Sequence, residues 1–304
     1  MNGRAPGWGR LVLLAVLATL DVVLVAGSLR LDGELGAAAN AVGPAVGLSP
    51  VDRFPSADSG TPGEARVLLD AAGTDALRVR GPGTCGGDAA LEKTTDGGRT
   101  WTGLTVPAAG VLRVALTDSA SGFLVGTDTA CTPAMYRTED GGQTWTRADG
   151  PAGVWHRAVQ SDVRHLHSPS GRVAVPCREP SGLADLASLG VRAAAVLCTD
   201  GSVYRTSDSG VRWAEQGTVT DATAIAFPTA SVAYAAASAT DTCGGVEIRT
   251  STDGGAQWEV TACLTDASPT GGTALSFSDA RNGMVLAGDA TYRTNDGGAT
   301  WTTA

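Results

Sequence analysis

Short apolar stretches recur along the chain after residue 65, and they come in pairs separated by polar turns. The pairs are 66–70 with 76–79, 111–116 with 122–125, 223–227 with 232–236, and 274–277 with 283–286. Runs this short, bounded by Gly, Asp and Ser, are typical of β-strands rather than helices. A further strand ends alike in Tyr136-Arg137-Thr138, Tyr204-Arg205-Thr206 and Tyr292-Arg293-Thr294. The pattern therefore predicts an all-β domain built from a repeated antiparallel unit.

An eight-residue phrase follows the third strand of this unit and occurs five times. Its first copy runs from Thr94 to Trp101, and five of the seven tryptophans of the chain close a copy. An Asp-Gly-Gly sequence supplies backbone positions that tolerate positive φ, so the phrase predicts a tight hairpin turn. The Asp, the following Gly and the Trp of the five copies are Asp96, Gly98, Trp101; Asp140, Gly142, Trp145; Asp208, Gly210, Trp213; Asp253, Gly255, Trp258; and Asp296, Gly298, Trp301.

The phrase has the form S/T-x-D-x-G-x-x-W, which resembles the Asp-box, or BNR repeat, of β-propellers in the sialidase-like superfamily. It is similar in particular to the Asp boxes of small propellers of the photosystem II assembly factor type. The resemblance covers about residues 66 to 304. It implies a propeller fold, in which the boxes lie on the rim away from the catalytic face. We therefore expect the box residues to be structural, so that replacing Asp253 lowers stability rather than ligand affinity.

The spacing of the boxes predicts the number of blades. Trp101 and Trp145 are 44 residues apart, Trp213 and Trp258 are 45 apart, and Trp258 and Trp301 are 43 apart. These intervals suit four-stranded blades. The 68 residues between Trp145 and Trp213 leave extra material at about 150–180, with strand-like runs at 163–167 and 173–177. We interpret this material as a sixth blade without a box. Five blades with a long insertion are the alternative.

The N-terminal region precedes this repeat and predicts membrane insertion. Residues 1–10 carry Arg4 and Arg10 and no acid, and an apolar run follows at 11–27. Asp21 is costly inside this run, but its length approaches what a bilayer requires. The basic flank predicts a cytoplasmic N-terminus with residues 66–304 outside the cytoplasm. We favour an uncleaved signal anchor over a cleaved signal peptide, which would give a secreted protein. Residues 28–65, rich in Pro, Gly and Ala, predict a linker.

Composition and charge narrow the function further. The 304 residues are 43% hydrophobic and carry a net charge of −9, so a basic stripe for nucleic acid is not expected. No phosphate-binding loop or metalloprotease helix is present in the sequence, and we expect no cofactor.

The six cysteines all lie in the part predicted to be exported, where disulfides are expected. Cys243 and Cys263 flank the fourth box, and Cys85 and Cys131 hold matching positions in neighbouring blades, which leaves Cys177 with Cys198. Six cysteines allow fifteen pairings, so this set is a hypothesis. The sequence contains no CxxC pair, so a zinc site is disfavoured.

All three histidines lie in the boxless segment. His165 and His167 are two residues apart on an expected strand and so share a face, and His156 precedes them. A transition-metal site formed by these three is one interpretation, and we favour the other, in which they are surface or turn residues and no metal is bound.

The sialidase resemblance implies particular chemistry: an arginine cluster, a tyrosine nucleophile with a Glu partner, and an Asp acid. The first repeat, around Arg66 and Asp70, lacks an Arg-Ile-Pro-like motif. We therefore predict a non-catalytic binding or scaffolding module for envelope proteins or glycans. A glycoside hydrolase of the sialidase-like type is the alternative.

Overall fold

The computed structural model describes residues 65–304 apart from 83–84, 151–152, 160–163, 240–241 and 269–271. The chain divides into two units, Met1–Ser56 and Ala57–Ala304, and the second holds every element described below. The predicted anchor at 11–27 lies outside the described residues, as does the predicted linker up to residue 64. In the described part of the chain, no helix is long and apolar enough to cross a membrane.

The second unit is a six-bladed β-propeller, as the box spacing predicts. Blade 1 contains β1 (Ala65–Ala72), β2 (Asp75–Pro82), β3 (Ala90–Thr94) and β4 (Thr102–Leu104), and blade 2 contains β5 (Gly110–Leu116), β6 (Gly122–Thr127), β7 (Pro133–Thr138) and β8 (Thr146–Ala148). Blade 3 contains β9 (His156–Arg157), β10 (His165–Ser168) and β11 (Gly171–Ala174).

The second half repeats the four-stranded pattern. Blade 4 contains β12 (Leu183–Ser188), β13 (Ala194–Cys198), β14 (Ser202–Thr206) and β15 (Ala214–Thr218). Blade 5 contains β16 (Ala222–Ala226), β17 (Ala233–Ala239), β18 (Gly245–Ser251) and β19 (Glu259–Leu264), and blade 6 contains β20 (Thr273–Phe277), β21 (Gly283–Ala287), β22 (Ala290–Thr294) and β23 (Thr302–Thr303). Every neighbouring pair of strands within a blade is antiparallel.

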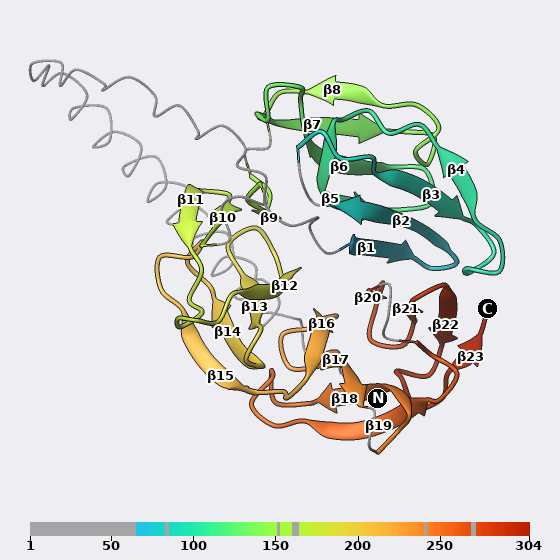
Figure 1. Cartoon of the computed structure of the whole chain (residues 1–304), viewed down its shortest axis with the longest axis vertical. Coiled ribbons are helices and arrows are strands. Elements are labelled where there is room, and N and C mark those ends of the chain that lie inside the picture. Colours follow the sequence, from blue (N-terminus) through green and yellow to red (C-terminus); the bar gives the residue numbers. More distant parts are fainter. Residues whose placement is uncertain (1–64, 83–84, 151–152, 160–163, 240–241, 269–271) are drawn as a thin grey trace, which may run out of the picture. The chain divides into compact units, whose positions relative to one another are not determined.

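The first strand of each blade is the innermost, and the inner strands follow one another around the ring (Figure 1). β1 contacts both β5 and β20, β5 contacts β9, β12 contacts β16, and β16 contacts β20. Blade 3 joins blade 4 through the guanidinium of Arg157, which donates to the carbonyl oxygen of Ala184. The ring therefore closes between blade 6 and blade 1 without a strand shared by the two, because each blade is one continuous segment.

Burial explains why apolar runs in the sequence predict the inner strands of each blade. Every residue of β13 is buried, because both faces of a second strand are covered by the neighbouring blades. The outermost strands β4 and β8 are mostly exposed, and they are correspondingly short and polar. Second strands therefore appear as continuous apolar runs, whereas fourth strands carry too little apolar pattern to be recognised.

Blade 3 differs from the other five, since it has three strands among the described residues. Its segment lacks the box that elsewhere turns the chain from the third strand into the fourth. After β11 the chain instead passes Cys177, which is disulfide-bonded to Cys198 of blade 4, and enters β12. The predicted runs at 163–167 and 173–177 correspond to β10 and β11, and the two-residue inner strand β9 carried no apolar pattern that could predict it.

Candidate functional site

The inner strands of all six blades line one cavity, the central channel of the propeller. Its volume is about 660 Å³, which is in the range of sites that bind small ligands or short segments. The charged residues that line it are Arg66, Asp70, Arg113, Arg157 and Asp185. All five come from blades 1 to 4.

Three arginines from three consecutive inner strands meet in this channel. Arg113 donates from Nη1 to the carbonyl oxygen of Trp155, and Arg157 donates from Nη2 to Oδ1 of Asp185 at 3.0 Å. Arg66 is different, because its Nη1 atom is buried and has no hydrogen-bond partner among the described residues. A buried donor without an acceptor is costly, so this guanidinium is a site where an anionic acceptor would be stabilised.

The two carboxylates of the channel also join neighbouring blades. Oδ2 of Asp70 accepts the backbone N–H of Leu116 at 2.7 Å, and Oδ2 of Asp185 accepts that of Ile225 at 2.9 Å. At the closing seam, the hydroxyl of Ser276 accepts the backbone N–H of Ala71 at 3.0 Å. Both carboxylates are therefore held by backbone donors as well as facing the arginines.

Burial shifts the ionisation of this cluster. It raises the pKa of Asp70 to about 6, against the opposing effects of the Leu116 N–H and the Arg113 charge. Burial, with the nearby Arg157 charge, lowers the pKa of Arg66 to about 10, and burial also lowers the pKa of Arg113. The channel lining therefore holds three guanidinium groups and two carboxyl groups.

Blades 5 and 6 give the channel a wall without charge. Its lining there includes Thr223, Ile225, Phe227, Leu275 and Phe277. A ligand in the channel would therefore meet guanidinium groups on one side and apolar or hydroxyl groups on the other. None of the channel-lining residues described is a tyrosine or a glutamate.

Histidine 156 lies at the edge of this site. Its ring is buried and stacks on that of His167, with ring centroids 4.5 Å apart and planes 6° apart. Burial lowers the pKa of His156 to about 4, so the ring is neutral at pH 7. His165 contacts Arg172, with Nδ1 and Nη2 3.0 Å apart. Parallel rings do not direct their nitrogens at a common point, and no group of three or more metal-binding side chains occurs within the described residues.

The five box turns lie away from the channel, at the junctions of third and fourth strands. In the first, the Thr94 hydroxyl donates to Asp96 and accepts the N–H of Gly98, and Asp96 accepts the N–H of Thr100 at 3.0 Å. The same contacts recur around Asp140, Asp208, Asp253 and Asp296. Hydrogen bonds from the residue four positions on are the largest cause that lowers the pKa of each of these five carboxyl groups.

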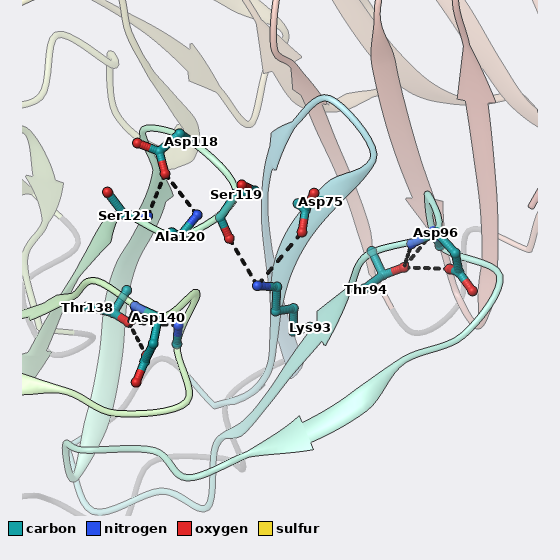
Figure 2. A network of polar contacts seen from close by, with 12 residues as sticks. Asp75, Lys93, Thr94, Asp96, Asp118, Ser119, Ala120, Ser121, Thr138 and Asp140 are labelled. Carbon is teal, nitrogen blue, oxygen red and sulfur yellow. Dashed lines mark hydrogen bonds and ion pairs between the residues drawn. The ribbon is translucent and has the colours of Figure 1, made fainter.

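Each box turn also contacts the preceding blade. In the second box, a Cβ at Gly141 would meet the Nζ atom of Lys93 in blade 1. Figure 2 shows this seam, where Lys93 lies between Asp75 and the carbonyl oxygen of Ser119 in the β5–β6 turn. The box tryptophans Trp145, Trp213, Trp258 and Trp301 pack against apolar clusters that span their own and the preceding blade. Trp101 does the same across the closing seam, against Met284 of blade 6.

The disulfides join the pairs that the sequence predicts. Cys85–Cys131 links blade 1 to blade 2, Cys177–Cys198 links the boxless blade to blade 4, and Cys243–Cys263 closes within blade 5. The described residues contain no free cysteine.

Sequence reasoning missed the channel cluster. Arg113 and Asp185 each follow an irregularity in an inner strand, and Arg66 stands near the start of another. The available signal was a charged residue within the first apolar run of a repeat. That signal does not show which charges converge, since convergence depends on how six strands meet.

Comparisons with known proteins find likeness to solved structures at low sequence identity. No family model matches the chain, and no curated protein matches it. A solved structure of YCF48 bound to a D1 peptide is 15% identical, with 76% of this chain and 77% of that one covered and a TM-score of 0.44. The Niastella koreensis GH74 enzyme is 17% identical over 77% of this chain and 46% of that one, with a TM-score of 0.41. The Hadza microbial sialidase Hz136 is 15% identical over 79% of this chain and 52% of that one, with a TM-score of 0.34.

Proposed function

We propose that this protein is a binding module whose central channel receives a carboxylate-bearing part of an envelope protein or glycan. The observation that carries the proposal is the buried Nη1 of Arg66, which has no acceptor among the described residues. A carboxylate placed beside it would accept charge-assisted hydrogen bonds, which are stronger than neutral ones. Arg113 and Arg157 would add to the attraction from the adjacent inner strands.

The charge distribution supports an anionic ligand. The chain has a net charge of −9, yet its channel holds three arginines and two carboxylates. Clustered guanidinium groups repel one another, and an anion bound between them would offset this repulsion. The uncharged wall around Phe227 and Phe277 suits an apolar part of the same ligand.

The setting of the function is the outer side of a membrane. Three disulfides are typical of an oxidising compartment outside the cytoplasm. The apolar run at 11–27 would tether the protein there, with cleavage and secretion as the alternative. In that position a scaffolding role would bring a channel-bound partner close to the membrane.

Glycoside hydrolysis is the second candidate, and Asp70 is the observation that favours it. Its raised pKa near 6 is typical of a carboxyl group that acts as a general acid. The channel lining among the described residues offers no tyrosine or glutamate as a nucleophile, which favours binding over catalysis.

The binding proposal is tested by calorimetric titration with two probes, triglutamate and N-acetylneuraminic acid. We expect at least one to bind, and Arg66→Met to weaken it about ten-fold or more, as for loss of a charge-assisted bond. Arg99→Met is the matched control, since Arg99 is an exposed residue of the first box turn. Binding that is equal in both variants would contradict a channel site, and preference between the probes separates protein from glycan ligands.

The catalytic alternative is tested with a fluorogenic sialoside. Turnover that disappears in Asp70→Asn, while the fold and the probe binding persist, would establish hydrolysis. Binding without turnover is the outcome expected from the proposal.

A further inference from the structure

The inner strand of blade 1 carries two opposite charges on one face. Arg66 and Asp70 are four residues apart in β1, which pairs with β2 in one continuous register without a bulge. Side chains four residues apart on a strand point to the same face, and their Cα atoms are about 13 Å apart. Both residues line the central channel. The channel therefore presents a positive and a negative group at two separate points along β1.

The guanidinium group of Arg66 has no direct partner for its charge. Its Nη1 atom is buried without a hydrogen-bond acceptor, and no ion pair of Arg66 occurs among the described residues. Asp185 is the carboxylate that acts on it, but Asp185 is already bound by Arg157 at 3.0 Å. The carboxylate of a ligand would therefore supply the acceptor that Arg66 lacks.

The carboxyl group of Asp70 is the negative counterpart. Its Oδ2 atom accepts the N–H of Leu116, and it forms no ion pair within the part of the chain that the structure describes. The charge of Arg113 is nearby, but Arg113 donates to the carbonyl oxygen of Trp155 and lies over the ring of Phe123. These contacts do not offset burial, which raises the pKa of Asp70 to about 6. A cation of a ligand beside Asp70 would stabilise its ionised form.

We propose that the channel ligand is a short peptide with both ends free, whose carboxylate binds Arg66 and whose ammonium group binds Asp70. This inference rests on the proposed function, to which it adds the ammonium group and the residue that selects it. The charges of the ligand would be about 10 Å apart, because the two side chains span part of the distance between their Cα atoms. An extended tripeptide has its charged ends about this far apart.

Calorimetric titration of the full chain with glycine peptides tests the class of ligand. Triglycine carries both charges, acetyl-triglycine only the carboxylate, and triglycine amide only the ammonium group. At pH 7 we expect triglycine to bind at least about ten-fold more tightly than either capped peptide, because each cap removes one charge-assisted contact. Glycine cannot span the two points, so it should also bind at least about ten-fold more weakly than triglycine. The inference is overturned if acetyl-triglycine or glycine binds as tightly as triglycine.

Asp70→Asn tests the residue that selects the ammonium group. Asn keeps an oxygen that can accept the N–H of Leu116 but carries no charge, so we expect the preference for triglycine over acetyl-triglycine to disappear. Asp149→Asn is the matched control, because it removes the same charge from an exposed position after β8, and it should keep the preference. A preference that persists in Asp70→Asn would overturn the assignment of Asp70.

Changes of pH and of Arg66 separate this inference from the proposed function. Between pH 7 and pH 5 Asp70 takes up a proton, whereas His156 stays neutral and both ends of triglycine stay charged. Triglycine should therefore bind more weakly at pH 5, and acetyl-triglycine more tightly. Arg66→Met should weaken both peptides. If both bind equally and both depend on Arg66, the carboxylate site stands and the ammonium site is overturned, and if neither depends on Arg66, the proposed function falls as well.

Discussion

At the scale of single residues, the glycines of the box turns combine two constraints. Gly98 has φ +96° and lies against the side chain of Thr291 in the preceding blade. Gly255 has nearly the same φ, +97°, but a Cβ there would meet its nearest atoms at 3.5 Å, an ordinary contact distance. The backbone requirement is therefore shared by both glycines, whereas the steric requirement is severe at Gly98 and absent at Gly255.

These two glycines form a matched pair for mutation. We expect Gly255→Ala to lower the free energy of unfolding by about 1–2 kcal/mol, the cost of a left-handed Ala. Gly98→Ala should cost more, by about 1–3 kcal/mol of overpacking against Thr291. Urea unfolding of both variants measures the difference. Equal losses in the free energy of unfolding would show that the turn conformation alone sets the cost of each substitution. The contact with Thr291 would then accommodate a methyl group.

Asp70 makes the stability of the folded protein depend on pH, and its raised pKa fixes the direction of the change. Its folded pKa is about 6 against an ordinary value of 3.8, so the folded state binds the proton more tightly. Stability from this group therefore falls as pH rises between about 4 and 6, by up to roughly 3 kcal/mol. His156 acts in the opposite direction, because its pKa is lowered to about 4, and stability from it is lost as pH falls below its ordinary value of 6.5.

Asp70→Asn isolates the carboxyl group, since His156 contributes equally to both proteins. We expect the melting temperature of the unmodified protein, relative to Asp70→Asn, to be higher at pH 5 than at pH 7. The same protonation removes a negative charge from the channel, so an anionic probe should bind more tightly at pH 5. A relative melting temperature that does not change with pH would place the Asp70 pKa near its ordinary value.

At the scale of elements, the seam between blades 2 and 3 is built differently from the others. No box tryptophan enters it, because blade 3 has no box, and no disulfide crosses it. Its contact is instead polar, through Arg113 and the carbonyl oxygen of Trp155. Blade 3 is held mainly from its other side, where Trp155 packs edge-on against Trp213 and Cys177 is bonded to Cys198.

The disulfides should therefore differ in how readily a reductant reaches them. Cys177 and Cys198 are 7% and 0% exposed, whereas Cys131 and Cys263 are exposed. Thiol–disulfide exchange requires access to a sulfur, so we expect the Cys177–Cys198 bond to be reduced last in the folded protein. Timed alkylation with mass spectrometry gives the order. Early loss of this bond would mean that blade 3 opens before the rest of the ring.

The elements also show how far the sequence could predict this structure. The box turns were predictable because Asp, Gly and Trp act locally, within eight residues that repeat. The three disulfides could be proposed from three different signals: Cys85 and Cys131 hold matching positions in neighbouring blades, Cys243 and Cys263 flank one box, and Cys177 and Cys198 remain. Blade 3 was predictable only as a deviation, since Arg157 in its two-residue inner strand carries no periodic signal. The channel was not predictable, because Arg66, Arg113 and Arg157 lie far apart in sequence and meet only when the ring closes.

At the scale of the whole molecule, the positive channel lies within a protein of net charge −9. An anionic ligand is repelled at long range and attracted only near the channel, and salt screens the long-range part over about 10 Å at 0.1 M. We expect the association rate of triglutamate to rise between about 20 and 200 mM salt, opposite to the trend for oppositely charged partners. Stopped-flow mixing measures this rate. We expect Arg66→Met to change the dissociation rate of triglutamate more than it changes the salt dependence of the association rate. A rate that falls with salt would show that the channel field dominates at long range.

The closure of the ring without a shared strand has a consequence for biogenesis. Blade 1 is made first, but the apolar side of it that contains Ala76 and Trp101 is covered by Met284 of blade 6. That side stays uncovered until the last blade has been made and folded, because no earlier segment supplies its neighbour. During synthesis this apolar side therefore stays exposed until almost the whole propeller has been made, and exposed apolar surface of this kind is what chaperones bind.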